Sequence, residues 1–168
     1  MSNFSSGRPA HFPGPIGWRT VYRFGLPGQA YYPHTLGAGT AATRLALDPP
    51  WVTALCAGMM RLGAGPLLQR STARRPVVRL FGTLQRVYSG QNQYALVLEV
   101  GGARGIAKLS LTGREESAGT ALGAAMMARG LSAGEVGRPG VWLPEQVIEP
   151  GSFFDRLAAR GLYVTSSG

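Results

Sequence analysis

The chain has 168 residues, with 17 Lys and Arg, 8 Asp and Glu, and one cysteine. This length fits one domain, and a hydrophobic content of 45% excludes wholesale disorder. The lone Cys56 excludes an intramolecular disulfide. With only His11 and His34 beside it, the chain lacks the ligands of a Cys/His zinc site, so we expect no metal. With two histidines in the chain, a Ser-His-Asp catalytic triad has little support as well.

The net charge of +9 comes entirely from the first half of the chain. Residues 1–90 hold ten arginines and one acid, Asp48, whereas residues 91–168 hold seven basic and seven acidic residues. Such an excess is typical of proteins that meet nucleic acid, an anionic membrane or an acidic partner. The preference for arginine over lysine is equally well explained by a GC-rich genome. No zinc finger, RNP-type aromatic stretch or basic helix is present, which argues against nucleic acid.

No targeting or membrane segment is evident. Residues 1–17 lack the apolar run of a secretory signal, and the most apolar stretch, residues 51–68, is interrupted by Arg, Gly and Pro. We therefore expect a cytoplasmic protein without a membrane partner. Its first 17 residues are predicted to be a loose N-terminal segment, and residues 18–168 a single domain.

The first half is predicted to contain few regular elements. Aromatic and β-branched residues predict a strand over residues 18–24, and weaker alternation predicts another over 41–47. Apolar residues at helical spacing predict a helix over residues 51–62, with Asp48 as a possible N-cap and Gly63 as its end. Residues 69–76 are an Arg-rich connector.

The second half is predicted to be more regular. We expect three consecutive strands, a long helix, a shorter helix and a terminal strand, over residues 77–88, 94–100, 104–111, 112–129, 152–160 and 162–164. Gly101-Gly102 suits a tight hairpin turn. Thr112 is the candidate N-cap of the long helix, and Gly130 its candidate end. The predicted fold is α+β, with a mixed, largely antiparallel sheet and helices packed mainly on one face.

The glycine-rich segments do not predict a nucleotide site. A dinucleotide fingerprint needs Gly-x-Gly-x-x-Gly between a strand and a helix. The Gly37-x-Gly39 pair precedes a predicted strand, and the Gly63-x-Gly65 pair follows a helix. We therefore expect no cofactor in this chain and no tight binding of NAD(P) by the chain alone.

Three residues are candidates for binding a substrate. His34 and Tyr31 share an aromatic, irregular segment, where a histidine can bind a carboxylate, transfer protons or serve a structural hydrogen bond. Arg44 interrupts an apolar strand, where a buried guanidinium needs an anion. An exposed arginine on an edge strand explains that position equally well. No residue is assigned a catalytic role.

The C-terminal part resembles a known family. Gly140-Val141-Trp142-Leu143-Pro144-Glu145, followed by Pro150, Phe153-Phe154, Leu157 and Arg160-Gly161, resembles the end of the saccharopine dehydrogenase/reductase family. The small-residue helix with Thr120-Ala121 that finishes at Arg129-Gly130 is similar to the helix that precedes this ending. The resemblance covers about residues 17–165.

The resemblance implies a substrate-binding and dimerisation domain of an NAD(P)-dependent oxidoreductase, without the Rossmann domain. Because family members associate through this domain, the resemblance implies a homodimer. Such a domain is not catalytic alone and would obtain NAD(P) only through a separate Rossmann-domain partner. The family's substrates are amino acids or related carboxylates. Two alternatives stay open: a non-redox module that binds an anionic metabolite or a protein, and a basic nucleic-acid-associated protein.

Overall fold

The structure is a computed structural model that describes residues 3–69, 75–80, 82–83 and 92–167. Its contacts divide the chain into two compact units. The basic unit, residues 1–11 and 18–91, holds ten arginines and one acid; the neutral unit, residues 12–17 and 92–168, holds seven residues of each sign. The single domain expected over residues 18–168 stays a prediction, because two compact units can belong to one domain.

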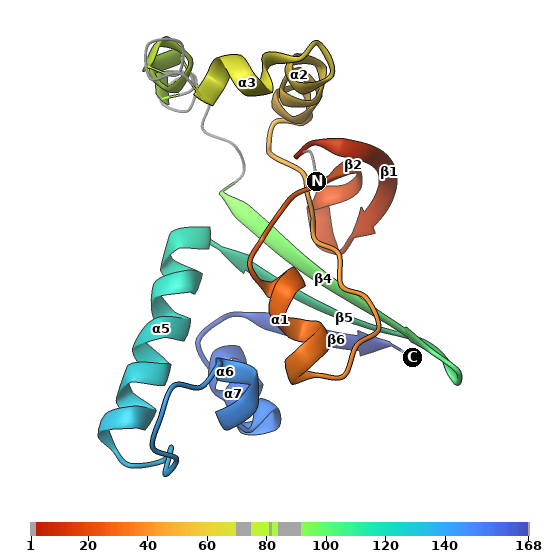
Figure 1. The fold of residues 1–168 in the computed structure, drawn as a ribbon. Helices are drawn as coiled ribbons and strands as arrows, with labels where there is room; N and C mark the ends of the chain where they lie inside the picture. Colours follow the sequence, from red (N-terminus) through yellow and green to blue (C-terminus); the bar gives the residue numbers. More distant parts are fainter. Residues whose placement is uncertain (1–2, 70–74, 81, 84–91, 168) are drawn as a thin grey trace. The chain divides into compact units, whose positions relative to one another are not determined.

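A small sheet forms the start of the basic unit (Figure 1). Its strands are β1 (Ser5–Phe12), β2 (Gly17–Arg23) and β3 (Arg44–Leu45), in the order β1-β2-β3. The strand predicted over 18–24 is confirmed as β2, and β3 is shorter than predicted. Residues 5–12 form a strand where we expected a loose segment. As an edge strand, β1 tolerates Pro9 and Gly7, which disfavour central strands.

Three short helices follow: α1 (Gly28–Thr35), α2 (Pro50–Arg61) and α3 (Ala64–Gln69). The helix predicted over 51–62 is confirmed as α2, and Gly63 ends it at φ 80°. Its N-cap is Pro49 rather than Asp48. No pattern predicted α1, because Pro33 interrupts its helical signal.

The strand predicted over residues 77–88 is wrong where the structure describes it. Residues 75–80 and 82–83 are helical, and the Thr83 hydroxyl donates a hydrogen bond of 3.0 Å to the carbonyl of Arg79, one helical turn earlier. Short apolar runs rich in valine do not separate strand from helix by periodicity alone. The remainder of that prediction lies outside the described residues.

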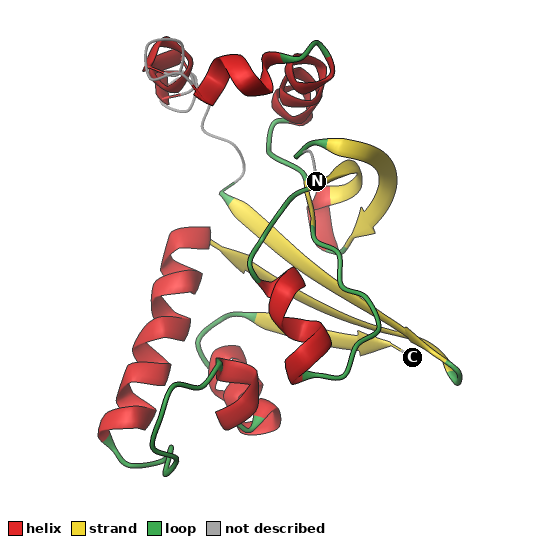
Figure 2. Ribbon diagram, in the orientation of Figure 1, coloured by secondary structure: helices red, strands yellow, loops and turns green. Residues whose placement is uncertain are grey.

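The neutral unit contains a longer antiparallel sheet (Figure 2). Its strands β4 (Gln93–Gly102), β5 (Gly105–Arg114) and β6 (Tyr163–Ser167) lie in the order β4-β5-β6. The two central predictions are confirmed, and the third strand comes from the chain end instead of residues 77–88. Gly101 and Gly102 pair within the ladder, with Gly102 opposite Gly105, so the turn is residues 103–104, two residues later than predicted. The short 3-10 helix η1 (Gly14–Ile16) contacts β4.

Helices α5 (Glu116–Ser132), α6 (Pro144–Val147) and α7 (Pro150–Ala158) lie on one side of this sheet (Figure 1). Tyr94 fixes the contact between α5 and the sheet. A Cβ atom added to Gly119 would lie 2.1 Å from the Tyr94 hydroxyl, and one added to Gly113 would lie 2.8 Å from it. The ring therefore occupies a slot that two glycines leave open. Its burial, and secondarily Glu116, raise the pKa of Tyr94.

The ends of α5 differ from prediction, whereas the end of α7 matches it. Helix α5 ends at Ser132, and Gly134, at φ 73°, follows its C-cap; the amides of Gly134 and Glu135 bond back to the carbonyls of Leu131 and Gly130. This Schellman arrangement needs a glycine in the left-handed region, and Gly130 itself is helical and buried. Glu115 precedes α5 in place of the predicted Thr112 cap.

The second helix, α7, ends near the glycine that the sequence indicates, Gly161, at φ 86°. Leu157 of α7 and Leu162 after it are both buried and form the small core below β6. The predicted α+β class is confirmed by helices and two three-stranded sheets in one chain. Within the described ranges, no helix combines the length and the apolar character needed to cross a membrane.

Candidate anion site on the basic sheet

Two arginines face each other across the central and third strands of the basic sheet. The register of β2 and β3 pairs Arg23 with Arg44, and Tyr22 with Leu45. Directly opposed residues of an antiparallel pair lie on the same face, with Cβ atoms about 5 Å apart. Two guanidinium groups are therefore held next to each other by the backbone itself.

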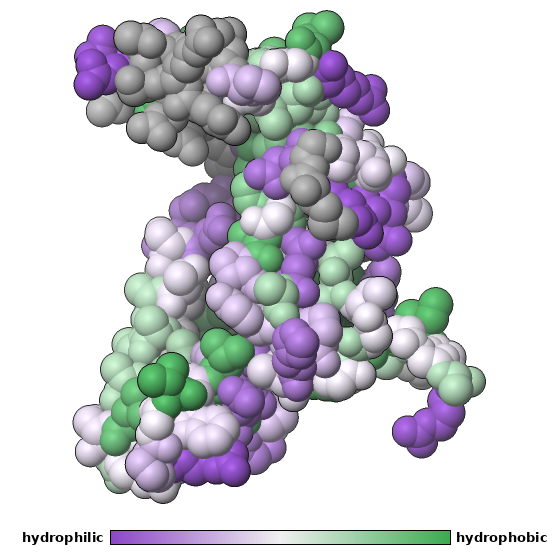
Figure 3. All heavy atoms as spheres, in the orientation of Figure 1, coloured by the Kyte–Doolittle hydropathy of each residue, from purple (hydrophilic) through white to green (hydrophobic). Residues whose placement is uncertain are grey.

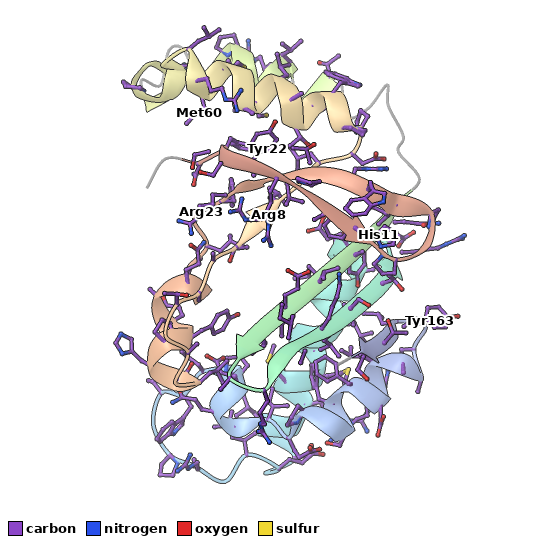
Figure 4. The ribbon with its side chains drawn as sticks, turned by 90° about the vertical axis from the view of Figure 1, so that its right-hand side faces the viewer. Arg8, His11, Tyr22, Arg23, Met60 and Tyr163 are labelled. Carbon is purple, nitrogen blue, oxygen red and sulfur yellow. The ribbon has the colours of Figure 1, made fainter. Side chains whose placement is uncertain are left out.

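A third arginine joins them from the first strand. Figure 4 shows Arg8 and Arg23 on the same side of the sheet, opposite the side toward which Tyr22 points. Partial burial lowers the pKa of Arg44, and the positive charges of Arg8 and Arg23 lower it further. We call Arg8, Arg23 and Arg44 the arginine cluster.

The backbone around the arginine cluster is well fixed. A guanidinium Nη1 of Arg44 donates a hydrogen bond of 2.5 Å to the carbonyl of Ser6, which ties β3 to β1. The amide of Phe4 donates to the carbonyl of Arg23 at 2.8 Å. The rings of Phe4 and Phe24 meet edge to face at 5.6 Å between centroids. These contacts hold the strands that carry the arginine cluster in place.

The other face of the sheet packs toward α2. A Cβ atom on Gly7 would lie 2.7 Å from the Tyr22 ring, so Tyr22 requires a glycine beside it on β1. The Thr53 hydroxyl of α2 accepts a hydrogen bond of 2.7 Å from the Leu47 amide and donates one of 3.1 Å to the Leu47 carbonyl. These part-buried bonds hold the segment that follows β3 against α2.

Electrostatics makes the arginine cluster a site for an anion. Like charges directly opposite on a sheet destabilise it, and the only acid among residues 1–91 is Asp48. An oxyanion between guanidinium groups accepts charge-assisted, often bidentate hydrogen bonds. The arrangement can therefore bind a carboxylate or a phosphate, and it offers no group that would transfer a proton near neutral pH.

The structure separates the three predicted site residues into two places. Arg44 lies in the arginine cluster. Tyr31 and His34 lie on α1, one helical turn apart and both exposed. Among the described residues, no hydrogen bond, ion pair or ring contact joins either of them to Arg44. Sequence reasoning missed Arg8 and Arg23, because only the pairing of β1, β2 and β3 brings them to Arg44.

Metal binding receives no support from the described part of the chain. Within it, no three His, Cys, Asp or Glu side chains are grouped so that they could hold a metal ion. Neither a known protein family, nor a curated protein, nor a solved structure matches the chain.

Proposed function

We propose that this chain binds an anionic metabolite through the arginine cluster. The observation that carries the proposal is the direct opposition of Arg23 and Arg44, with Arg8 beside them. A carboxylate or phosphate group would relieve the repulsion between the three guanidinium groups. A ligand with two anionic groups would use the cluster best, because two oxyanions can each bridge a pair of arginines.

In this proposal the chain serves as the substrate-binding and dimerisation domain of a saccharopine-dehydrogenase-like, NAD(P)-dependent oxidoreductase. The family pattern at residues 140–161 supports that setting, and so does the α+β fold. The chain binds and orients the anionic substrate, whereas a separate Rossmann domain supplies NAD(P). A titration of the chain alone with NADPH is expected to give no saturable micromolar binding. A non-redox binding module is the alternative, and it would use the same arginine cluster.

Homodimerisation is the second part of the proposal, and one face of the neutral sheet supports it. Leu96, Leu98 and Val100 alternate along β4 on the same face as Tyr94, and they are 61%, 56% and 56% exposed. Their partners on β5 are Leu111, Leu109 and Ala107. We call Leu96, Leu98 and Val100 the apolar stripe. Exposed stripes of this kind typically mark an interaction surface.

The helices leave the apolar stripe uncovered. Tyr94 contacts Gly119 of α5 at one end of the sheet, while the β4–β5 hairpin extends past the helices of the neutral unit (Figure 1). Figure 3 shows hydrophobic and hydrophilic side chains together at the projecting end of this hairpin. A second copy is the occupant that we propose, because β4 is an edge strand and a two-fold axis would bring two stripes together. The neutral unit carries no net charge that would repel its copy.

Anion binding is tested by calorimetric titration with glutarate and with inorganic phosphate. Arg23→Gln and Arg44→Gln are each expected to weaken binding about tenfold or more, which is the effect of one lost hydrogen bond to a charged group. Arg61→Gln is the matched control, because it removes the same charge from the exposed C-terminal end of α2. It should change the affinity by less than about threefold at 0.15 M salt, where distant surface charges are screened.

Two results would contradict the proposal. Equal losses in all three variants would mean that the basic unit attracts anions only through its overall charge. Absence of saturable binding by the unmodified chain at millimolar glutarate and phosphate would remove the site altogether. The dimer does not depend on either result and has its own test.

A further inference from the structure

A second hollow lies on the opposite face of the basic sheet. Alternation along β2 directs Trp18, Thr20 and Tyr22 away from the face that carries Arg23. Figure 4 shows Tyr22 pointing toward α2, while Arg8 and Arg23 lie on the other side. Between this face and the start of α2 there is a hollow of about 380 Å³, lined by residues that include Trp18, Tyr22, Trp51 and Ala54. The arginine cluster does not line it.

Aromatic surface dominates the walls of this hollow. Trp18 is 69% exposed and Trp51 is 46% exposed, although an indole is among the largest apolar side chains. The hydroxyl of Thr53, which also lines the hollow, already bonds both backbone groups of Leu47. The aromatic lining residues Trp18, Tyr22 and Trp51 are therefore the surfaces that a flat ring can contact in this hollow. The volume lies within the range of small-molecule sites.

A positive charge stands beside the aromatic walls. Arg19 also lines the hollow, and its Nη1 donates a hydrogen bond of 3.0 Å to the carbonyl of Trp18. This bond fixes the guanidinium at the backbone of β2, where Arg19 lines the hollow, and a guanidinium has five N–H donors. One bond to a carbonyl leaves donors for an anionic group. The ten arginines and single acid of the basic unit favour a negative ligand there as well.

We propose that this hollow is a binding site for a planar aromatic ring that carries a carboxylate. The ring lies against the indoles of Trp18 and Trp51, and the carboxylate accepts hydrogen bonds from Arg19. This site is distinct from the arginine cluster, because the two lie on opposite faces of one sheet. The arginine cluster would bind ligands by their negative charge alone, whereas the hollow would bind ligands that have both a flat ring and a negative charge.

The test is calorimetric titration with three probes of matched size or charge. 2-Naphthoate offers both the ring and the carboxylate, 2-naphthylmethanol offers the ring alone, and cyclohexanecarboxylate offers the carboxylate without an aromatic face. We expect 2-naphthoate to bind most tightly. Trp51→Ala should weaken it about tenfold, in line with the loss of an aromatic contact. Arg19→Gln should lower the affinity for 2-naphthoate and leave the affinity for 2-naphthylmethanol unchanged.

Trp142→Ala is the matched control. Trp142 is also partly exposed, at 41%, but it belongs to the neutral unit, where Arg138 lies 4.6 Å from its ring centroid. This variant should bind 2-naphthoate like the unmodified chain. Ala54→Phe provides a second test of the site, because it fills the hollow instead of removing a wall. It should abolish binding while circular dichroism shows the fold intact.

Several outcomes would overturn the proposal. Equal affinities for 2-naphthoate and cyclohexanecarboxylate would show that the aromatic walls do not contribute. An unchanged affinity in both Trp51→Ala and Ala54→Phe would place the bound probe elsewhere on the chain. A tenfold loss in Trp142→Ala would assign it to the neutral unit.

Discussion

The basic unit and the neutral unit use charged side chains in opposite ways. In the neutral unit, Lys108 lies 3.4 Å from Glu99 across the β4–β5 ladder, and Arg156 lies 3.2 Å from Glu135. In the basic unit, Arg23 and Arg44 face each other instead. Charges that are paired within a unit satisfy its own structure, whereas like charges held together by a sheet indicate a ligand from outside.

Apolar side chains show the reverse contrast. The basic unit buries Val21 of β2 and Val52 and Ala57 of α2. The neutral unit leaves the apolar stripe of β4 more than half exposed. The proposed ligand of the basic unit is therefore an anion, and the proposed partner of the neutral unit is an apolar surface on a second copy.

The largest expected effect concerns the apolar stripe. Leu96→Asp places a charge within the proposed dimer contact, and burying an unpaired carboxylate is strongly unfavourable. We expect the dimer dissociation constant to rise by about 100-fold or more, the effect of a few kcal/mol. Sedimentation velocity across a concentration series measures this shift.

The neighbouring residue provides the control for that experiment. Val97 lies on the opposite face of β4, which it shares with Glu99, Lys108 and Ser110 by the register of the ladder. Val97→Asp should leave the association constant nearly unchanged. A dimer that both substitutions split equally, or an unmodified chain that is monomeric at tens of micromolar, would contradict dimerisation through the apolar stripe.

The next effect concerns packing inside the neutral unit. Gly119→Ala would bring a Cβ atom to 2.1 Å from the Tyr94 hydroxyl, so the ring must leave its slot. Overpacking of this kind costs about 1–3 kcal/mol of unfolding free energy, partly offset by the better helix propensity of alanine. Urea unfolding should show a net loss. The double variant Gly119→Ala, Tyr94→Leu should recover part of it.

Gly123 on the same helix has the opposite expectation. An added Cβ atom there meets no atom within 4 Å, so only the helix propensity changes. Gly123→Ala should raise the unfolding free energy by about 0.5–1 kcal/mol. If both alanine variants changed stability in the same direction, the slot for Tyr94 would not be a packing constraint.

The sequence predicted the neutral unit better than the basic unit, for physical reasons. Strands β4 and β5 are neighbours joined by a tight turn, so their local patterns contain most of the information that pairs them. The pairing of Arg23 with Arg44 depends on a chain reversal of about twenty residues that includes α1, whose Pro33 hides its helical signal. The sequence around Arg44 makes it a candidate site residue by itself. Arg8 and Arg23 become its neighbours only through the order in which the three strands pair. The side of β4 that carries Leu96 likewise required the contact between Tyr94 and Gly119.

A further effect distinguishes the two units by their response to anions. Phosphate at ten times its dissociation constant should stabilise the unit that binds it by about 1.4 kcal/mol. Hydrogen exchange is expected to slow in β2 and β3 and to stay unchanged in β4 and β5. Sodium chloride of equal ionic strength serves as the control, and Arg44→Gln should abolish the response. Equal protection of both sheets would contradict a site confined to the basic unit.

The smallest expected effect is the pH dependence of one helix cap in the neutral unit. The Glu149 carboxylate accepts hydrogen bonds from the Ser152 amide at 2.6 Å and the Gly151 amide at 2.9 Å, at the start of α7. These bonds, that of Ser152 foremost, lower the pKa of Glu149. A pKa that is lower in the folded than in the unfolded chain adds stability above the unfolded value of about 4.3, and this stability is lost as the pH falls through the folded value.

Glu149→Gln should therefore lower the unfolding free energy of the neutral unit at pH 7. The difference from the unmodified chain should shrink as the pH falls toward 3, as measured by urea unfolding. A difference between Glu149→Gln and the unmodified chain that is equally large at pH 3 and pH 7 would mean that the cap does not depend on the carboxylate charge.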